Sequence, residues 1–497
     1  MADARTAAKG AAWTISSSLL SRGLGLIGTL VLIRFVAPSS YGEVSAAVVV
    51  VGTVNQFSTL GVGIYAIATR DATREDLYHA TFIHMTLGLL AFFGLLFLGK
   101  PLSPLFGAPN MYEYVPLLAC AAMAERIAFM PERVLIRNLR FKRVSLVRSL
   151  GEVTYAVTSV FLAWRGFGGL SIAIGNVARS GIRMLATVVS VKRIDWLQIG
   201  PIRYPVLRKI GGYGFLTALG HLGYYATLKW DNLMVSRYFG PAVMGGYNLA
   251  YSLAEIPATQ VAEQITDVMQ ASYAHMSSDD RRRTLLRSFG VIALVTFPLT
   301  VGLGAIAPTL ADVFLDKKWA GTGAMLMALS MLFVVRPPYA AVASYITVEQ
   351  GPRPLIVVEW LTVAVLLAGL LTFGRISPLW ACGAVGVAFT MRALIGMFVV
   401  HSSSEVRMRT LLGRVWQPLL ACIPLAAAVF GSRILLHRAG IRSPLLLLPI
   451  EVVAGGLAYI GAALLVARGA ANDVIGLVRR SRHREAPNPP VATSGAS

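Results

Sequence analysis

Charged residues are scarce in this 497-residue chain: 14% of its residues are Asp, Glu, Lys or Arg, whereas 56% are hydrophobic. A soluble protein carries about a quarter charged residues. The charge is absent from long apolar blocks, each long enough to cross a bilayer. The loops between these blocks are short and leave no room for a soluble catalytic domain. We therefore expect a membrane protein.

Cysteine is scarcer still, and each of the three cysteines falls inside an expected membrane span: Cys120, Cys382 and Cys422. They imply no disulfide framework, and the chain shows no metal-ligand spacing. Residues 94–101 imitate a phosphate-binding P-loop, but Pro101 stands where Ser or Thr is required. We expect no ATPase and no bound cofactor, and only H⁺ or Na⁺ as a coupling ion is left open.

Apolar stretches predict an all-α polytopic membrane protein with about fourteen transmembrane helices. The first half of the chain contains six of them: 12–34, 44–68, 80–99, 114–131, 144–164 and 168–190. The second half contains another six: 211–236, 246–270, 286–306, 322–345, 354–374 and 379–400. Two more spans follow, 415–436 and 444–467, with almost no interior charge. This last pair is either a lipid-facing addition or a groove that guides a lipid tail.

A short motif occurs twice and indicates an internal duplication. Residues 34–42 read Arg-Phe-Val-Ala-Pro-Ser-Ser-Tyr-Gly, and residues 237–245 read Arg-Tyr-Phe-Gly-Pro-Ala-Val-Met-Gly, an offset of 203 positions. About six spans separate the copies, so both halves cross the membrane in the same direction. They are expected to be related by a pseudo-twofold axis along the bilayer normal. Duplicated bundles of this kind bind substrate at their interface and rock around it, which favours a transporter.

The duplication divides the chain into five regions. Two six-helix lobes cover residues 1–191 and 211–402, and a basic cytoplasmic linker, 192–210, joins them. Residues 403–470 hold the two additional helices. Residues 471–497 are basic and then rich in Pro, Ala and Ser, which predicts a disordered cytoplasmic tail.

The net charge of +21 is concentrated in loops on one side of the expected membrane. Basic clusters at 133–148 and 281–287 fall in loops on the same side as both termini. The positive-inside rule then places both termini in the cytoplasm of a protein that crosses the cytoplasmic membrane many times. These clusters are suited to anionic lipid headgroups. This distribution favours membrane lipids over nucleic acid as the partner.

Seven basic residues lie inside expected spans: Arg22, Arg126, Arg179, Arg183, Lys229, Arg336 and Arg392. Each costs at least about 2.5–3.5 kcal/mol unless it faces water or a partner. Helical spacing places Asn176, Arg179 and Arg183 on one face, and Arg22 lies on another polar stripe. Arginine matches phosphate oxygens bidentately, so we expect a cavity that binds a phosphorylated group. The alternative is structural pairing with carboxylates, or, for Arg392, extension to the inner surface.

Six residues are the candidates for this cavity: Arg22, Arg126, Asn176, Arg179, Arg183 and Arg336. Acidic residues at other depths are candidates for a coupling ion, namely Asp231, Glu255 and Glu263. Glu255 and Glu263 belong to a polar stripe in span 246–270 that lipid cannot solvate. For Asp231 a local ion pair with Lys229 is the alternative.

With these features the chain resembles the Wzx-type polysaccharide flippases of the multidrug/oligosaccharidyl-lipid/polysaccharide exporter superfamily. The segments that carry the resemblance are 10–13, 32–42, 61–63 with Arg70, 139–142, Asp231 and 240–247. The resemblance implies two six-helix lobes around a V-shaped cavity that opens to either side in turn. It also implies an ion-coupled antiporter that flips an undecaprenyl-pyrophosphate-linked oligosaccharide for exopolysaccharide or O-antigen (lipopolysaccharide) assembly. A polymerase and glycosyltransferases of the same pathway would be its partners.

Three alternatives are left open. Fourteen spans, and an arginine at Arg22 where lipid II flippases carry one in their cavity, are compatible with lipid II as the substrate. A multidrug cation exporter of the same superfamily would need a cavity dominated by carboxylates and aromatic rings. A membrane-embedded glycan polymerase would need a large outer loop, whereas the outer loops here are short.

Overall fold

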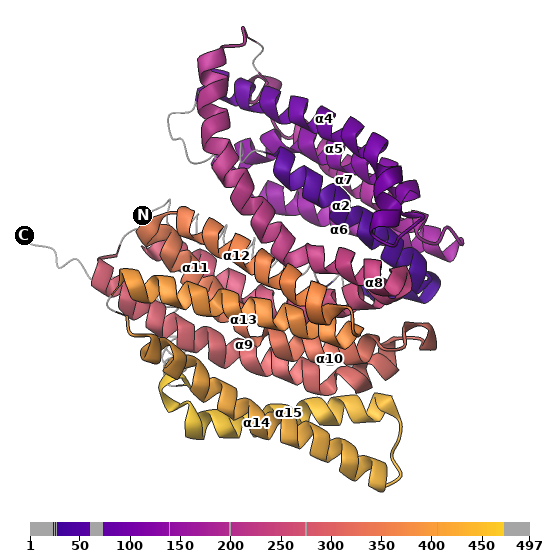
Figure 1. Cartoon of the computed structure of the whole chain (residues 1–497), viewed down its shortest axis with the longest axis vertical. Coiled ribbons are helices and arrows are strands. Elements are labelled where there is room, and N and C mark those ends of the chain that lie inside the picture. Colours follow the sequence, from indigo (N-terminus) through magenta and orange to yellow (C-terminus); the bar gives the residue numbers. More distant parts are fainter. Residues whose placement is uncertain are drawn as a thin grey trace, which may run out of the picture. The chain divides into compact units, whose positions relative to one another are not determined.

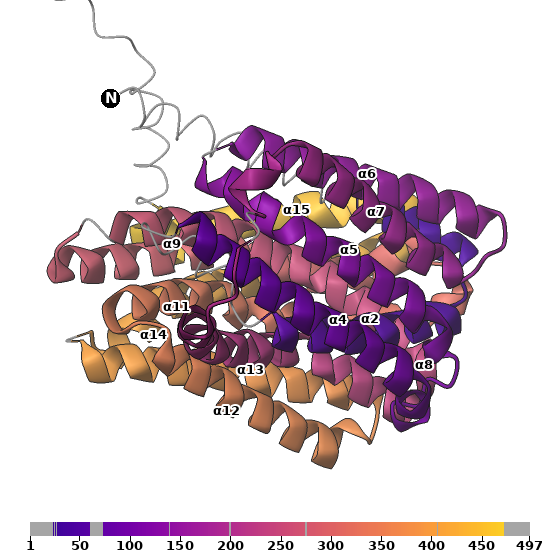
Figure 2. The same cartoon turned by 90° about the horizontal axis from the view of Figure 1, so that it is seen from above.

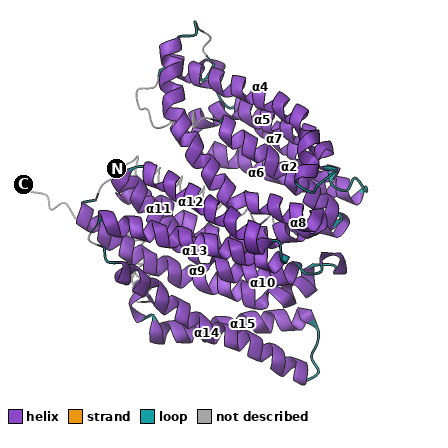
Figure 3. Ribbon diagram, viewed as in Figure 1, coloured by secondary structure: helices purple, strands orange, loops and turns teal. Residues whose placement is uncertain are grey.

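The computed structural model describes residues 23, 25, 27–59, 73–138, 140–197, 200–273, 276–404 and 406–471. Within these ranges the chain is helical and contains no strand, and Figure 3 shows helices joined by short loops. The predicted all-α fold is confirmed.

Thirteen long helices follow one another along the described chain. Their bounds are α2 Pro38–Ser58, α4 Arg74–Leu105, α5 Met111–Arg137, α6 Phe141–Trp164, α7 Leu170–Val189, α8 Tyr204–Tyr273, α9 Ser278–Phe314, α10 Thr322–Leu332, α11 Arg336–Gln350, α12 Arg353–Gly369, α13 Pro378–Ser403, α14 Met408–Arg438 and α15 Pro444–Val466. Residues 27–35 are helical as well. Short helical turns occupy Arg193–Asp195, Lys317–Trp319, Phe333–Val335 and Leu370–Gly374.

The helices correspond to the expected membrane spans. In the part of the chain that the structure describes, ten helical segments are long and apolar enough to cross a bilayer, and each coincides with one expected span. The expected spans 211–236 and 246–270 both lie in α8, which is broken at Gly240 with a φ of 82°. Glycine adopts this conformation without a steric penalty, so α8 is two helices that meet at one residue. Most of span 12–34 lies outside the described residues.

The chain forms two compact units. The first contains residues 1–256, 307–333 and 350–395, and the second contains residues 257–306, 334–349 and 396–497. In the first unit α2 and α4 to α7 pack together as one helical bundle (Figures 1 and 2). In the second unit α14 and α15 lie side by side and share an apolar core with α9 (Figure 1). The five-region division expected from the duplication stays a prediction.

The two copies of the repeated motif meet inside the first unit. α2 begins at Pro38, and the second part of α8 begins at Pro241. The Pro241 carbonyl lies against Gly42, and the Pro38 carbonyl lies against Gly245. A Cβ atom on either glycine would overlap the opposite carbonyl, so both positions need glycine. The contact is reciprocal, as a twofold relation between the halves requires.

Two loops extend this reciprocal contact. Near the end of the first helix, the Ile33 carbonyl accepts a 3.1 Å hydrogen bond from Trp319, in the loop after α9. The equivalent carbonyl in the second half, at Ser236, lies against Gly107 in the loop after α4. Each half thus covers the helix end of the other half. Under the expected topology all these residues lie at the outer surface.

Candidate functional site

Charged side chains gather where α5, α6 and α7 pack together. Arg179 and Arg183 lie one turn apart on α7 and face Glu125 and Glu132 of α5 and Glu152 of α6. Arg183 is 3.3 Å from Glu132 and 3.8 Å from Glu125. Arg179 is 3.9 Å from both Glu125 and Glu152. We call these five residues, together with Arg148, the arginine cluster.

Neutral neighbours orient the two α7 arginines. Asn176 accepts a 2.7 Å hydrogen bond from Arg179, and the Arg179 guanidinium lies 5.4 Å from the centre of the Tyr155 ring. The backbone at Gly151 leaves room for the Arg183 side chain, since a Cβ there would lie 2.6 Å from its Cγ atom. The predicted shared face of Asn176, Arg179 and Arg183 is therefore present in the fold, and it is directed at α5 and α6.

The cluster has a tight part and a loose part. Glu132 accepts two hydrogen bonds from Arg148, of 2.5 and 3.1 Å, and its side chain is only 12% exposed. Glu125 and Glu152 are 37% and 31% exposed, and their distances to arginine are longer. Neither Arg179 nor Arg183 is confined to a single carboxylate. Both can reach solvent, so an anionic ligand can approach them.

Arg126 points to a different face of α5 from its neighbour Glu125. It is 4% exposed and donates hydrogen bonds to Asn55 and Ser58 at the end of α2 and to the His84 carbonyl on α4. Carbonyls at a helix C-terminus lack intrahelical donors and carry partial negative charge. The Arg126 guanidinium supplies hydrogen-bond donors and a positive charge to these carbonyls, so its contacts hold α2, α4 and α5 together.

The other candidates lie elsewhere. Arg22 and the side chain of Glu263 are outside the described residues. Arg336 is buried at the start of α11, in the second compact unit. Glu255 lies 3.8 Å from Lys229, and buried Asp231 accepts a 2.6 Å hydrogen bond from the Tyr247 hydroxyl.

Two expectations about charge in the second half are wrong. Arg392 does not extend to the surface: it is 5% exposed and bonds through Nε to Glu359 of α12 at 3.1 Å. The last two helices do contain an interior charge pair. Arg433 of α14 binds Glu451 of α15 through two hydrogen bonds of 2.7 and 3.1 Å, and Glu451 is fully buried. One arginine and one glutamate in adjacent apolar spans were the sequence signal for this pair.

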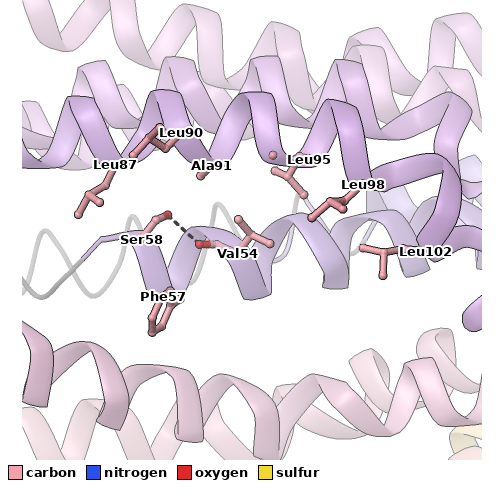
Figure 4. Close-up of a pocket in the computed structure, with 10 residues that line it drawn as sticks. Val54, Phe57, Ser58, Leu87, Leu90, Ala91, Leu95, Leu98 and Leu102 are labelled. Carbon is pink, nitrogen blue, oxygen red and sulfur yellow. Dashed lines mark hydrogen bonds between the residues drawn. The ribbon is translucent and has the colours of Figure 1, made fainter.

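Two apolar grooves open on the surface of the first unit. One has a volume of about 330 Å³ between α2 and α4, lined by leucines with Val54, Phe57 and Ser58 (Figure 4). The Ser58 hydroxyl donates a 2.7 Å hydrogen bond to the Val54 carbonyl one turn earlier on α2 (Figure 4). The other groove, of about 520 Å³, lies between the ends of α12 and α13 beside Phe373 and Trp380. In the described residues no group of three His, Cys, Asp or Glu side chains could hold a metal.

A duplicated helical scaffold with many membrane-crossing helices and a half-buried charge cluster defines a polytopic membrane transporter. A family model described as polysaccharide biosynthesis protein matches residues 31–323, and the chain belongs to this family. The resemblance to the Wzx-type flippases is confirmed.

Curated relatives match most of the chain. The succinoglycan biosynthesis transport protein ExoT of Rhizobium meliloti (strain 1021) is 23% identical over 98% of this chain and 98% of its own length. The lipopolysaccharide biosynthesis protein WzxC of Escherichia coli (strain K12) is 20% identical, covering 66% of this chain and 67% of its own. The teichuronic acid biosynthesis protein TuaB of Bacillus subtilis (strain 168) is 21% identical over 81% and 83%.

Solved structures share the fold. The lipid II flippase MurJ in an inward closed conformation aligns with a TM-score of 0.76 at 14% identity, covering 92% of this chain and 98% of that one. An inward-facing multidrug resistance transporter of the MATE family aligns with a TM-score of 0.63 at 16% identity, over 78% and 95%. The chain therefore has the fold of these membrane transporters.

Proposed function

We propose that the protein flips an undecaprenyl-pyrophosphate-linked oligosaccharide repeat unit across the cytoplasmic membrane, for exopolysaccharide or O-antigen assembly. The observation that carries this proposal is the arginine cluster. The pyrophosphate binds Arg179 and Arg183, the sugars lie in the polar cavity, and the polyprenyl tail stays in the bilayer. Both termini lie in the cytoplasm.

The chemistry of the cluster supports a phosphate ligand. Two guanidinium groups one turn apart present paired N–H donors, and such donors fit phosphate oxygens better than a lysine does. Ionisable residues inside transmembrane segments face the bundle interior or a water-filled cavity and mark substrate or ion paths. A cation exporter would place carboxylates without arginines at this position. The arginines therefore favour an anionic cargo over a cationic drug.

The position of the cluster supports loading from the cytoplasm. Glu132 and Arg148 border the basic loop that is expected on the cytoplasmic side. The reciprocal contacts of the two halves involve α2, α8 and the loops after α4 and α9, and under the expected topology they lie at the outer surface. A headgroup made in the cytoplasm would thus reach the arginines while the outer end is closed, and alternating access would then expose it outside.

Further residues complete the proposal. Arg22 and Arg336 are the further candidates for binding the substrate, and Asn176 holds Arg179 in place. Asp231, Glu255 and Glu263 are the candidates for carrying a coupling ion, H⁺ or Na⁺. We propose a structural role for Arg126 in place of the expected substrate contact, because its hydrogen bonds go to Asn55 and Ser58 of α2 and His84 of α4.

The test is transport of a fluorescent undecaprenyl-pyrophosphate glycan in vesicles, together with polymer export in cells. Arg179→Ala combined with Arg183→Ala should abolish both while the protein accumulates normally in the membrane. The matched control is Arg165→Ala, since Arg165 stacks on Phe161 and Trp164 outside the cluster. Normal flipping by the double variant would refute the assignment. A preference for lipid II over the oligosaccharide in the same vesicles would redirect it to cell-wall synthesis.

A further inference from the structure

The charges of the arginine cluster are nearly balanced before any ligand binds. Arg148, Arg179 and Arg183 face Glu125, Glu132 and Glu152. Arg133, next to Glu132 and Arg148, adds one further positive charge. A pyrophosphate adds at least two negative charges to this group. Unbalanced charge inside a membrane is strongly unfavourable, because the low dielectric screens it poorly.

We propose that pyrophosphate binding is an exchange in which the ligand replaces Glu125 and Glu152 at the arginines and these two carboxylates take up protons. The proposal rests on the proposed function and describes how the same site accommodates its ligand. Each carboxylate gains one proton and forms an O–H bond, the proton coming from a hydronium ion or a buffer acid that is left as water or the buffer base. The arginine N–H groups that faced the carboxylates then donate to phosphate oxygens. The loaded site then has nearly the same net charge as the empty site.

The geometry selects which glutamates are exchanged. Glu125 lies 3.9 Å from Arg179 and 3.8 Å from Arg183, too long for a strong hydrogen bond to either. Glu152 has a 3.9 Å contact with Arg179 and is 31% exposed. Glu152 can rotate toward water without breaking a short bond, and Glu125 gives up one, the 3.1 Å hydrogen bond that it accepts from the Ser180 hydroxyl. Glu132 cannot, because it is 12% exposed and Arg148 holds it from two nitrogens.

The remaining neighbours do not neutralise displaced carboxylates. The charged and titratable groups around Glu125 and Glu152 are Glu132 on α5, Arg148 and Tyr155 on α6, Arg179 and Arg183 on α7, and Tyr41 on α2 through its proximity to Tyr155. Arg148 is engaged by Glu132, and the two tyrosines are neutral. Once phosphate binds Arg179 and Arg183, protonation is the remaining way to remove the charge of the two carboxylates.

This exchange separates two roles of protons in the cycle. A proton that binds with the substrate also leaves with it, so it cannot be the ion that drives export by moving inward. The driving ion must bind at another place, which agrees with the assignment of Asp231, Glu255 and Glu263 to coupling. The glutamates of the cluster instead keep the net charge of the site nearly constant as it changes sides.

The test counts protons during binding of geranyl pyrophosphate to the purified full-length protein. Isothermal titration calorimetry in two buffers of different ionisation enthalpy gives the protons taken up per ligand bound. The wild type should take up about one or two protons more than the Glu125→Gln/Glu152→Gln variant. As pH rises, the affinity of the wild type for the ligand should therefore fall more steeply than that of the variant, by about tenfold per pH unit for each extra proton. Titration of the ligand itself contributes equally to both proteins and cancels in the difference. Glu113→Gln, an exposed position on the same helix, is the matched control.

The outcomes separate this inference from the function. Binding that needs Arg179 and Arg183 but shows equal proton uptake in the wild type and the glutamine variant overturns the exchange alone. Binding that is unaffected by Arg179→Ala and Arg183→Ala overturns the proposed function as well. If the double glutamine variant does not fold, Glu152→Gln alone decides: the exchange requires that it lowers the uptake by about half, and unchanged uptake contradicts it.

Discussion

Gly42 and Gly245, which are repeat-equivalent residues, pack against each other's helix start. One turn further along each helix, Asn248 donates a 3.0 Å hydrogen bond to Ser45, and these two residues are again 203 positions apart. Equivalent residues that touch each other lie on the pseudo-twofold axis itself. The repeated motif thus serves as the place where the two halves meet at one end of the bundle.

The contact between Ser45 and Asn248 should have to open during transport. Cysteines at Ser45 and Asn248 are expected to form a disulfide on oxidation and to block flipping, because this end could then no longer open. Reduction should restore transport. The experiment uses a Cys120→Ser background, since Cys120 is exposed whereas Cys382 and Cys422 are buried. Each single cysteine variant is the control, and undiminished flipping by the cross-linked protein would contradict a moving contact.

The glycines themselves should be intolerant of side chains. Gly42→Val and Gly245→Val each place atoms where a carbonyl of the opposite half lies, so close approach of the two helices becomes impossible. Loss of transport is expected from each, with reduced thermal stability of the purified protein. Gly94→Val on α4 has open space around its Cβ position and is the matched control. Wild-type stability and transport in Gly42→Val would show that the packing is not required.

A conservative change at the cluster should separate charge from geometry. Arg183→Lys keeps the positive charge but cannot donate two parallel hydrogen bonds to a phosphate. A hydrogen bond to a charged group contributes about 1.5–3 kcal/mol, so affinity for geranyl pyrophosphate should fall by about 10- to 100-fold. Calorimetry measures the change directly, and Arg165→Lys provides the control. Equal affinity for the lysine variant would mean that charge alone suffices.

Much of the helical architecture could be predicted from the sequence, because apolar length alone decides where a helix can cross a bilayer. The alternation of apolar blocks predicted ten helices that the structure contains. The spacing of Asn176, Arg179 and Arg183 predicted their common face, since residues three and four apart are neighbours on a helix. These features are local in sequence.

Contacts between helices could not be predicted in the same way. Nothing in the sequence says that Glu359 pairs with Arg392 or that the Arg126 guanidinium ends on the carbonyls of α2, because such partners depend on how helices pack. The Arg433–Glu451 pair was missed for a related reason, because one charge in each of two otherwise apolar spans does not show that the two residues face each other. The packing of three helices at Ala305, whose carbonyl also accepts from Arg433, explains why these charges are buried.

Glu255 provides a test of ion coupling. Its carboxylate lies 3.8 Å from Lys229, whose ammonium is also 5.2 Å from the centre of the Tyr251 ring. Glu255→Gln should leave headgroup binding at the arginine cluster unchanged and remove the response of flipping to an imposed proton or Na⁺ gradient. Vesicles loaded at different pH or Na⁺ concentration measure this response. Asp279→Asn, an exposed position, is the control, and an unaltered gradient response in Glu255→Gln would exclude this role.

The buried pair of α14 and α15 makes the sharpest prediction about stability. Arg433→Met leaves the Glu451 carboxylate buried without its bidentate partner, and breaking a buried pair from one side destabilises a protein by about 3–5 kcal/mol. Arg433→Met combined with Glu451→Leu removes both charges and should recover most of that loss, since an apolar replacement of a buried pair is often neutral. Thermal unfolding of the purified variants measures both effects.

Because the pair lies away from the arginine cluster in sequence and in a different compact unit, the double variant should flip substrate normally. If the double variant is as unstable as the single one, the pair contributes packing that leucine and methionine cannot replace; if it is stable but inactive, the two additional helices take part in transport.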